Sequence, residues 1–443
     1  MNSDFLIDGN ILVKYQGTGS SVVIPDGVTV IGEGAFASRR ELTEVSFPAE
    51  LLRIERSAFA LCSVEKVVLP DSLEYLGEFA FSNCFKLNEV VFPSHLEEID
   101  RSAFSRCINL QRISLPEGLV SLKRGVFLGC ANLLEVVLPR TLKDVDNIAF
   151  SGCNKLRRVA VHPDNAHLSE LDGVLYSKDG SRMMYCPGGL LETVIPSRVT
   201  SIGDLAFYEN PNIDRLSLHK GLCEIGNLAF YRCTELIEIV LPESLVKIGE
   251  SVFDGCRNLR RLSIPEGVTS IGQSSFYNCK GLYWLKLPKG LPFDLHWFAG
   301  PNDPPCYSAD KTVIPFVTSR PIEDIDSVMG LKRAAFGFIK ADMAGVDISP
   351  EIAAGYKDYI EKNIDDFLTK SLTDDEILQW LCNNRMIPPE RVEEMLDKVS
   401  DAGLAGASVL LLDYQKRSVS IPRLERGGRL EQRFEALENA LDF

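Results

Sequence analysis

A repeat of 23 residues is the feature that most constrains the fold of this chain. The stretch LPEGLVSLKRGVFLGC at 115–130 has close counterparts 23 residues earlier, FPSHLEEIDRSAFSRC, and 23 residues later, LPRTLKDVDNIAFSGC. The same step, once shortened to 22, separates the phenylalanines at 36, 59, 81, 104, 127 and 150 and again those at 207, 230, 253 and 276. Such units bury their apolar side only by stacking on their neighbours. The sequence therefore predicts an elongated solenoid in two stacks.

Within one unit, the spacing of apolar residues predicts a strand followed by a turn. Ile113 and Leu115 alternate around Ser114, which is the period of a short strand, and Pro116 ends it. The set Val126, Phe127 and Cys130 lies on one face of a single helical turn, so this face is expected to point inward. We predict a leucine-rich-repeat solenoid of parallel β strands with short helical turns.

A cysteine follows most of the repeat phenylalanines by three residues. It is replaced by Arg39 and Asn210, and it occurs at 62, 84, 107, 130, 153, 233, 256 and 279. We expect these thiols to be reduced and packed beneath the turn, because stacked equivalent residues suit disulfide geometry poorly. Zinc sites favour clustered pairs such as CxxC, so no metal and no cofactor is expected. A ladder of reduced thiols fits a cytoplasmic location.

The repeat resembles a known family. The stretch LPESLVKIGESVFDGCRNLRRL from Leu241 looks like the BspA-like leucine-rich repeat, and the similarity covers about residues 20–290. The resemblance implies a binding or adhesive surface and no chemistry. Many members are displayed on cells, so a cell-surface adhesin of the BspA type is an alternative function.

Breaks in the period divide the chain into segments. Asp8-Gly9 and Asp172-Gly173, each flanked by apolar residues, predict β-hairpins that cap the stacks. The predicted segments are an N-terminal hairpin cap (1–20), a first stack (21–160), an interrupting hairpin (161–190), a second stack (191–290), a Pro-rich connector (291–321) and a helical domain (322–443).

The last of these segments is predicted to be all α-helical. Thr373 and Glu376 have capping-box spacing, a second helix follows Pro389, and further helices are expected at 405–414 and 430–441. Residues 375–415 faintly resemble an ankyrin-type helical repeat.

The residue four before each repeat proline forms a column of alternating charge. It reads Glu44, Lys66, Glu89, Arg112, Glu135, Arg158, Glu192, Arg215, Glu238, Arg261 and Trp284. Opposite charges on stacked strands are expected to pair. A structural role is one interpretation; the other makes Arg112, Arg158, Arg215 and Arg261 binding residues.

Aromatic residues gather in the second stack. Tyr208, Tyr231 and Tyr277 directly follow their phenylalanines, where the first stack has Ala37, Ala60, Ser82 and Ser105. Together with Tyr283 and Trp284 they are candidate anchors of an interface. In the alternative interpretation, Tyr283 and Trp284 cover the last turn or pack on the next segment of the chain, near Phe293 or Trp297.

Composition excludes several functions. A net charge of -15 and a pI near 5.0 argue against nucleic acid as a partner. The sequence has no run of about 18 apolar residues, so no membrane insertion is predicted. The first residues lack the pattern of a secretory leader, which also favours the cytoplasm. Since no catalytic motif is found, we predict a non-enzymatic scaffold for an unknown protein partner, of unknown oligomeric state. An enzyme or effector in the C-terminal helical domain is the other alternative.

Overall fold

The structure is a computed structural model of the chain. It describes residues 4–288, 290–291, 294–298, 316–317, 328–343, 345–346, 348–372 and 374–418. The described residues form two compact units. The first holds the repeats, and the second holds the helices together with Tyr283–Lys286. The predicted helix at 430–441 and most of the predicted connector lie outside the described residues.

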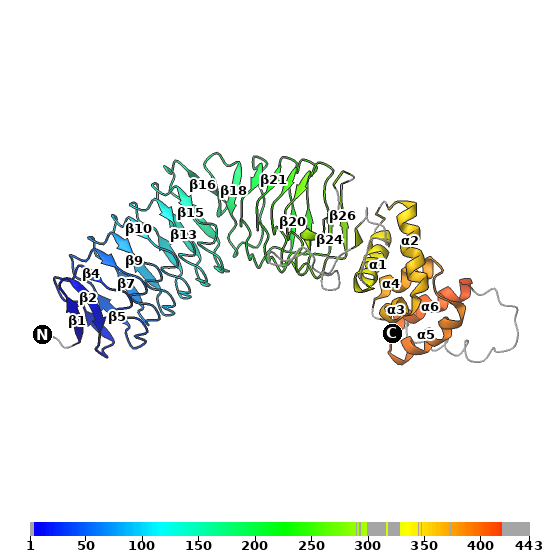
Figure 1. Ribbon diagram of the computed structural model, residues 1–443, viewed down its shortest axis with the longest axis horizontal. Coiled ribbons are helices and arrows are strands. Elements are labelled where there is room, and N and C mark those ends of the chain that lie inside the picture. The colour runs from blue at the N-terminus through cyan, green and yellow to red at the C-terminus, as the bar shows by residue number, and fades with distance from the viewer. Residues whose placement is uncertain are drawn as a thin grey trace, which may run out of the picture. The chain divides into compact units, whose positions relative to one another are not determined.

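Most coils of the first unit contribute a short outer strand whose middle residue is buried or half-buried (Figure 1). These strands pair in parallel and in register at steps of one coil, as in Glu135↔Arg158. They are β3 (Ser21–Val23), β5 (Glu44–Ser46), β7 (Lys66–Val68), β9 (Glu89–Val91), β11 (Arg112–Ser114), β13 (Glu135–Leu138), β15 (Arg158–Val161), β20 (Arg215–Ser217), β22 (Glu238–Val240) and β24 (Arg261–Ser263).

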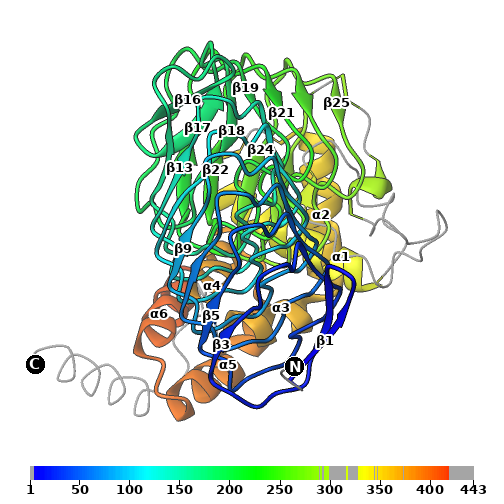
Figure 2. The ribbon, with the colours of Figure 1, turned by 90° about the vertical axis from the view of Figure 1, so that its left-hand side faces the viewer.

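A second series of two-residue strands runs along the same coils (Figure 2), and the sequence did not predict it. Two residues are too few to show a period of two, so the signal was absent. These strands also pair in parallel. They are β4 (Val30–Ile31), β6 (Arg53–Ile54), β8 (Tyr75–Leu76), β10 (Glu98–Ile99), β12 (Ser121–Leu122), β14 (Asp144–Val145), β19 (Ser201–Ile202), β21 (Glu224–Ile225), β23 (Lys247–Ile248) and β25 (Ser270–Ile271).

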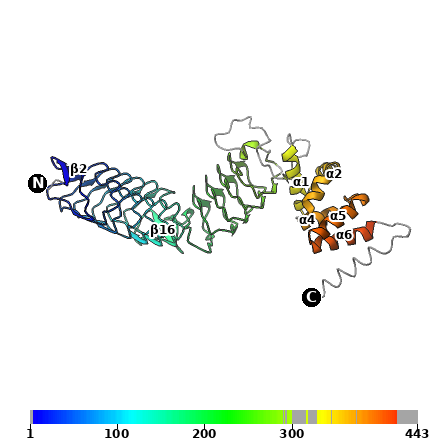
Figure 3. The same cartoon turned by 90° about the horizontal axis from the view of Figure 1, so that it is seen from below.

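Both predicted hairpins are confirmed. β1 (Phe5–Asp8) pairs antiparallel with β2 (Ile11–Tyr15), and β2 pairs with β4 at the start of the first stack. Between the stacks, β16 (Leu168–Leu171), β17 (Val174–Ser177) and β18 (Arg182–Tyr185) form an antiparallel meander, and β18 pairs with β19. Figure 3 shows β2 at the N-terminal end of the coils and β16 between the two stacks. Each stack therefore starts from its own capping strands.

The segment around each repeat phenylalanine is a series of tight turns. Ser57 and Leu61, on either side of Phe59, adopt left-handed conformations with φ of 53° and 64°, and Gly125 and Gly129 do the same around Phe127. Every second N–H in this segment donates to the next coil, as Phe59 does to the Ala80 carbonyl at 2.8 Å. The backbone thus forms a third ladder along the solenoid, where the spacing had predicted one helical turn.

The core of the first unit is a column of stacked rings. Phe104, Phe127 and Phe150 are at most 1% exposed, and neighbouring ring centroids lie 5.8 and 6.0 Å apart with nearly parallel planes. The second stack repeats this arrangement from Phe207 to Phe276. The prediction that the phenylalanine face points inward is confirmed.

The repeat cysteines complete the hydrogen bonding of the phenylalanine carbonyls. The Cys130 thiol donates to the Phe104 carbonyl of the preceding coil at 3.2 Å, and that carbonyl also accepts the Cys107 N–H. The same thiol bond recurs in the other seven coils that carry the cysteine. At two places without the cysteine another donor acts: the Arg39 guanidinium donates to the Tyr15 carbonyl, and the Tyr185 hydroxyl donates to the Phe150 carbonyl. The cysteine is therefore a buried donor as well as a small core residue.

The second unit is helical, with two short strands. β26 (Trp284–Lys286) pairs in parallel with β27 (Phe316–Val317). The helices are α1 (Val328–Met343), α2 (Pro350–Lys362), α3 (Ile364–Ser371), α4 (Asp375–Asn383), α5 (Pro389–Asp401) and α6 (Ala405–Ser418). The first unit also contains the short 3-10 helix η1 (Leu295–Trp297). None of the described helices has the length and apolar character needed to cross a bilayer.

Side-chain bonds fix the helices to one another. Trp380 of α4 donates to the Asp342 carboxylate of α1 at 2.7 Å, and the Tyr414 hydroxyl of α6 donates to the Ile387 carbonyl at 2.8 Å. The N-cap of α4 is Asp374, whose carboxylate accepts the Ile377 N–H at 3.4 Å. The predicted cap, Thr373, lies outside the described residues.

Candidate functional site

The column of alternating charge forms ion pairs along the outer strands, as predicted. Lys66 lies 2.8 Å from Glu89, and Arg158 lies 3.5 Å from Glu135 and 3.2 Å from Glu170 of the hairpin. In the second stack, Glu238 lies between two arginines, 3.6 Å from Arg215 and 2.8 Å from Arg261. Arg158, Arg215 and Arg261 therefore already have carboxylate partners within the protein. The predicted column member Glu192 belongs to no strand.

Arg112 differs from the other three arginines. It is exposed on β11, in register with Glu135, but forms no ion pair in the part of the chain that the structure describes. Its guanidinium is the one member of the predicted set that is available to a partner without breaking an existing ion pair.

The three predicted tyrosines of the second stack occupy one column. Tyr208 and Tyr231 stack with ring centroids 5.0 Å apart and planes 13° from parallel. The Arg232 guanidinium lies 5.1 Å from the centroid of Tyr231 and pairs with Glu209 at 3.3 Å. Tyr208, Tyr231 and Tyr277 are all partly exposed. The column thus offers aromatic surface beside an exposed ion pair.

Asp254 occupies the position in this column between Tyr231 and Tyr277. It is 7% exposed, and its carboxylate accepts a hydrogen bond from the Asn278 side chain. Burial raises the pKa of Asp254 to about 6, although the charge of Arg232 and the Asn278 bond act in the opposite direction. Among the described residues it forms no ion pair. A carboxylate that is buried without a direct ion pair is unusual in a repeat surface.

Tyr283 and Trp284 lie apart from this column, in the second compact unit. Trp284 is 7% exposed and belongs to the apolar core of the helices with Phe338 and Trp380. Lys340 of α1 lies 5.9 Å from the ring centroid of Tyr283. The prediction of Trp284 as an exposed anchor therefore needs correction, since the ring fills a core. Trp297, which the alternative interpretation placed near it, contacts Phe276 of the last repeat.

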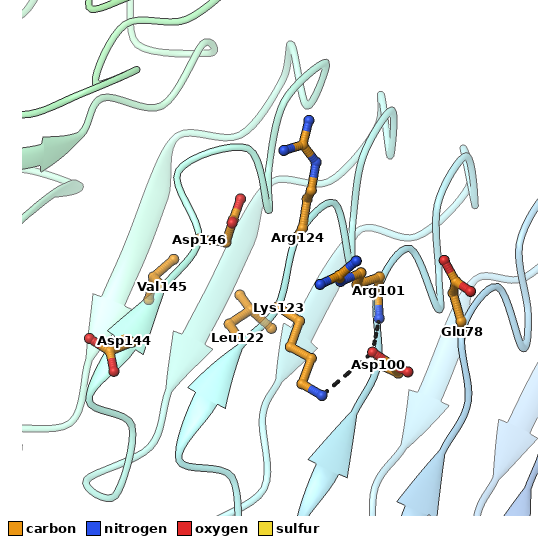
Figure 4. A pocket seen from close by; sticks show the side chains of 9 residues that line it. All are labelled: Glu78, Asp100, Arg101, Leu122, Lys123, Arg124, Asp144, Val145 and Asp146. Carbon is orange, nitrogen blue, oxygen red and sulfur yellow. Dashed lines mark hydrogen bonds and ion pairs between the residues drawn. The ribbon is translucent and has the colours of Figure 1, made fainter. Parts of the chain in front are cut away.

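A shallow polar groove crosses the second series of strands in the first stack (Figure 4). Lys123 pairs with Glu98 and lies 3.5 Å from Asp100, which also accepts bonds from the Arg101 N–H at 2.8 Å and the Tyr75 hydroxyl at 3.2 Å. Burial favours a higher pKa for Asp100, but these donors outweigh it and lower the pKa. The groove's central charges thus satisfy one another.

These surfaces belong to coils with a recognisable sequence. The pattern of the BspA type leucine-rich repeat region matches residues 15–99, 52–171 and 181–300, with 6 copies and over more than half of the chain. The chain belongs to this family.

Solved structures with similar coils include two bacterial proteins. The pneumococcal vaccine antigen PcpA is 29% identical, with 61% of this chain and 62% of that chain covered and a TM-score of 0.45. A leucine rich cell surface protein from Faecalibacterium prausnitzii A2-165 is 24% identical, with 66% and 89% covered and a TM-score of 0.51. This chain spans less than two thirds of the pneumococcal chain. The comparison with curated proteins gives no match.

Within this BspA type repeat protein, Asp254 is the functional candidate that sequence reasoning missed. The column after the phenylalanines reads Tyr208, Tyr231, Asp254 and Tyr277, so the interruption is visible in the sequence. Its burial could not be read there, because acidic residues are usually exposed. In the part of the chain that is described, no group of three or more His, Cys, Asp or Glu side chains is placed to hold a metal ion.

Proposed function

We propose that this protein is a non-enzymatic scaffold that binds a partner protein through the tyrosine column of its second stack, Tyr208, Tyr231 and Tyr277. The observation that carries the proposal is the stacked, partly exposed pair Tyr208 and Tyr231. The first stack has alanine or serine at most equivalent positions, so the coil does not require an aromatic ring there. Rigid aromatic side chains are common anchors of interfaces.

The test is recovery of a partner from the native cell with a double variant, Tyr208→Ser with Tyr231→Ser. The control exchanges two exposed valines of the first stack, Val68→Ser with Val91→Ser, where Ser46 and Ser114 occupy equivalent positions. Since an anchor residue commonly contributes about 2 kcal/mol to the binding free energy, the tyrosine variant should recover at least tenfold less partner than the unchanged protein. Equal recovery with both variants would exclude the column as the interface.

Arg112 is a second candidate contact. Its exposed guanidinium has no ion pair among the described residues, whereas Arg158, Arg215 and Arg261 are paired. Arg112→Gln should reduce partner recovery if a carboxylate of the partner reaches the first stack, and Arg215→Gln serves as the matched control.

We also propose a cytoplasmic location, and the thiol ladder supports it. Oxidation of a repeat cysteine would remove the donor that satisfies a buried carbonyl. Alkylation of the denatured protein, prepared from its native source without reductant, should modify all 12 cysteines. The alternative is display as a surface adhesin, in line with the F. prausnitzii relative, which is described as a cell surface protein. A count well below 12 would favour that alternative.

A further inference from the structure

The tight turns around the repeat phenylalanines form one face of the coils, and its cations are paired in most of them. We call the turn face the residues from three before to two after each of these phenylalanines. Outside the coils of Phe104, Phe127 and Phe150 it carries two cations. They are Arg56, which lies 3.7 Å from Glu78, and Arg232, which lies 3.3 Å from Glu209.

Three consecutive coils depart from this balance. Their turn faces, at 101–106, 124–129 and 147–152, contain Arg101, Arg106 and Arg124 but no acidic residue. All three side chains are exposed, and none of them forms an ion pair within the described ranges. These three residues are the arginine patch. Its positive charge is in excess on this face, in a chain whose net charge is -15.

The members of the arginine patch are neighbours in the backbone ladder. The Ser102 N–H donates to the Arg124 carbonyl at 3.0 Å, so Arg101 and Arg124 occupy equivalent positions on adjacent coils. The stem of Arg106 lies against Gly129 of the following coil, where a Cβ would come within 3.3 Å of the Arg106 Cγ. Adjacent strands lie about 4.8 Å apart, and like charges at equivalent positions repel. The stability of the fold therefore gives no reason for two arginines in succession.

The polar groove of Figure 4 does not neutralise the two arginines at its edge, Arg101 and Arg124. Three of its four carboxylates have donors of their own, which are Arg56 for Glu78, Lys123 for Asp100 and the Ile148 N–H for Asp146. The fourth, Asp144, lies away from Arg101 and Arg124 in Figure 4. Both guanidinium groups are thus open to an anion from outside.

The arginine patch adjoins the tyrosine column. The Ser151 hydroxyl donates to the Glu209 carboxylate at 3.4 Å, which joins the coil of Phe150 to the coil of Tyr208. Burial raises the pKa of the Tyr208 hydroxyl, and the charges of Arg232 and Arg124 act against this rise. Arg124 is therefore near enough to Tyr208 for one bound segment to contact both.

We propose that the arginine patch binds an acidic segment of the partner protein, beside the part of the partner that contacts the tyrosine column. Guanidinium groups form charge-assisted, often bidentate hydrogen bonds with carboxylates, so Arg101 and Arg124 suit two carboxylates of one extended segment. The net charge of -15 repels a long polyanion, which favours a short acidic segment over nucleic acid. The inference rests on the proposed function and names the chemistry of its partner.

The experiment adds the full chain to short dye-labelled peptides and follows their fluorescence anisotropy. One peptide alternates glycine with glutamate, and its counterpart alternates glycine with glutamine. The glutamate peptide should bind saturably with a dissociation constant on the order of 0.1–1 mM at low salt, at least tenfold more tightly than the glutamine peptide. Added salt should weaken this binding. A single-stranded oligonucleotide of equal charge should bind no more tightly than the glutamate peptide.

Variants locate the site. Arg101→Gln with Arg124→Gln should weaken binding of the glutamate peptide at least fivefold, while the melting temperature stays equal or rises because two like charges no longer repel. The matched control, Arg257→Gln with Arg260→Gln, removes the same charge from exposed side chains outside the turn face. It should change binding by less than about twofold.

Five results would overturn the arginine patch as a binding site. They are no saturable binding of the glutamate peptide, equal binding of the glutamine peptide, tighter binding of the oligonucleotide, an equal loss with the control variant, and a melting temperature that falls with Arg101→Gln and Arg124→Gln. The last result would assign both arginines to the fold.

Partner recovery separates this failure from that of the proposed function. If Tyr208→Ser with Tyr231→Ser loses the partner while Arg101→Gln with Arg124→Gln keeps it, the tyrosine column is the interface and the arginine patch is not part of it. If the glutamate peptide binds the patch but the tyrosine variant keeps the partner, the proposed function fails and the acidic binding site stands.

Discussion

Replacement of Cys130 by alanine tests whether the repeat cysteines stabilise the solenoid as hydrogen-bond donors. Cys130 is fully buried, and its thiol is the second donor to the Phe104 carbonyl. Burial raises the pKa of the Cys130 thiol to about 12, because the thiolate would be desolvated. The side chain is therefore a protonated donor throughout the physiological range, and the donor should be lost only by mutation or oxidation.

The expected cost has two parts. Removing the buried sulfur forfeits roughly the transfer free energy of one methylene, about 0.8 kcal/mol. Losing the thiol hydrogen bond costs at most about a further 1 kcal/mol, the usual net value of one hydrogen bond. Because a thiol is a weak donor, the actual cost should be smaller than that. The Phe104 carbonyl keeps the Cys107 N–H at 3.2 Å, so it is not left without a partner. Together these predict a loss of about 1–2 kcal/mol in the free energy of unfolding.

Urea unfolding followed by circular dichroism measures this loss, with Cys223→Ala as the control. Cys223 is exposed and lies outside the ladder, so its replacement should be nearly neutral. The infrared S–H band of Cys130, identified by its disappearance in Cys130→Ala, should lie at lower frequency than that of Cys223. Equal stability of the two variants, or an S–H band at the frequency of an exposed thiol, would refute the donor role.

Three further substitutions test other parts of the structure. Phe127→Ala should lower the free energy of unfolding by about 3–5 kcal/mol because it removes a fully buried ring, whereas Arg112→Ala should lower it by less than about 1 kcal/mol. A lower melting temperature for Arg112→Ala than for Phe127→Ala would contradict the column of stacked rings. The pKa of Asp254 is raised from 3.8 to about 6, so the folded state loses stability as pH rises through that interval, by roughly 3 kcal/mol at most. Asp254→Asn should remove this pH dependence of stability in melts from pH 4 to 7. An unchanged pH dependence would show that another group causes it. Trp284→Ala should destabilise the helical unit, monitored by Trp380 fluorescence, while partner recovery per folded molecule stays unchanged. If the variant lost partner recovery at an unchanged melting temperature, Trp284 would belong to the interface.

The solenoid was predictable because each coil repeats the same local pattern. The step between phenylalanines fixes the stacking, and the alternation around Ser114 identifies the outer strand. The left-handed residues beside each ring escaped prediction, because positions such as Ser57 and Leu61 carry side chains that give no signal of positive φ. There the bonds between coils determine the backbone conformation.

The site was predictable only in part. The tyrosines stood out against the small residues of the first stack. For Trp284 a surface anchor and a packed residue both stayed open, because no local pattern indicates that β26 packs with helices far along the chain. Asp254 was overlooked for the opposite reason, since a single acidic residue suggests exposure. In both cases burial depends on tertiary contacts between residues that are distant in the sequence.

The direction of the thiol bonds has a consequence for how the chain is made. Each S–H donor reaches back to the coil synthesised before it, as Cys130 does to Phe104, so a carbonyl is completed only by the coil that emerges next from the ribosome. A nascent stack therefore has one phenylalanine carbonyl that still lacks its thiol donor. This carbonyl is always in the last coil formed, however many coils precede it. Where the first series of coils ends, the Tyr185 hydroxyl donates to the Phe150 carbonyl in place of a thiol. The last carbonyl of the first stack therefore has its second donor before the second stack begins.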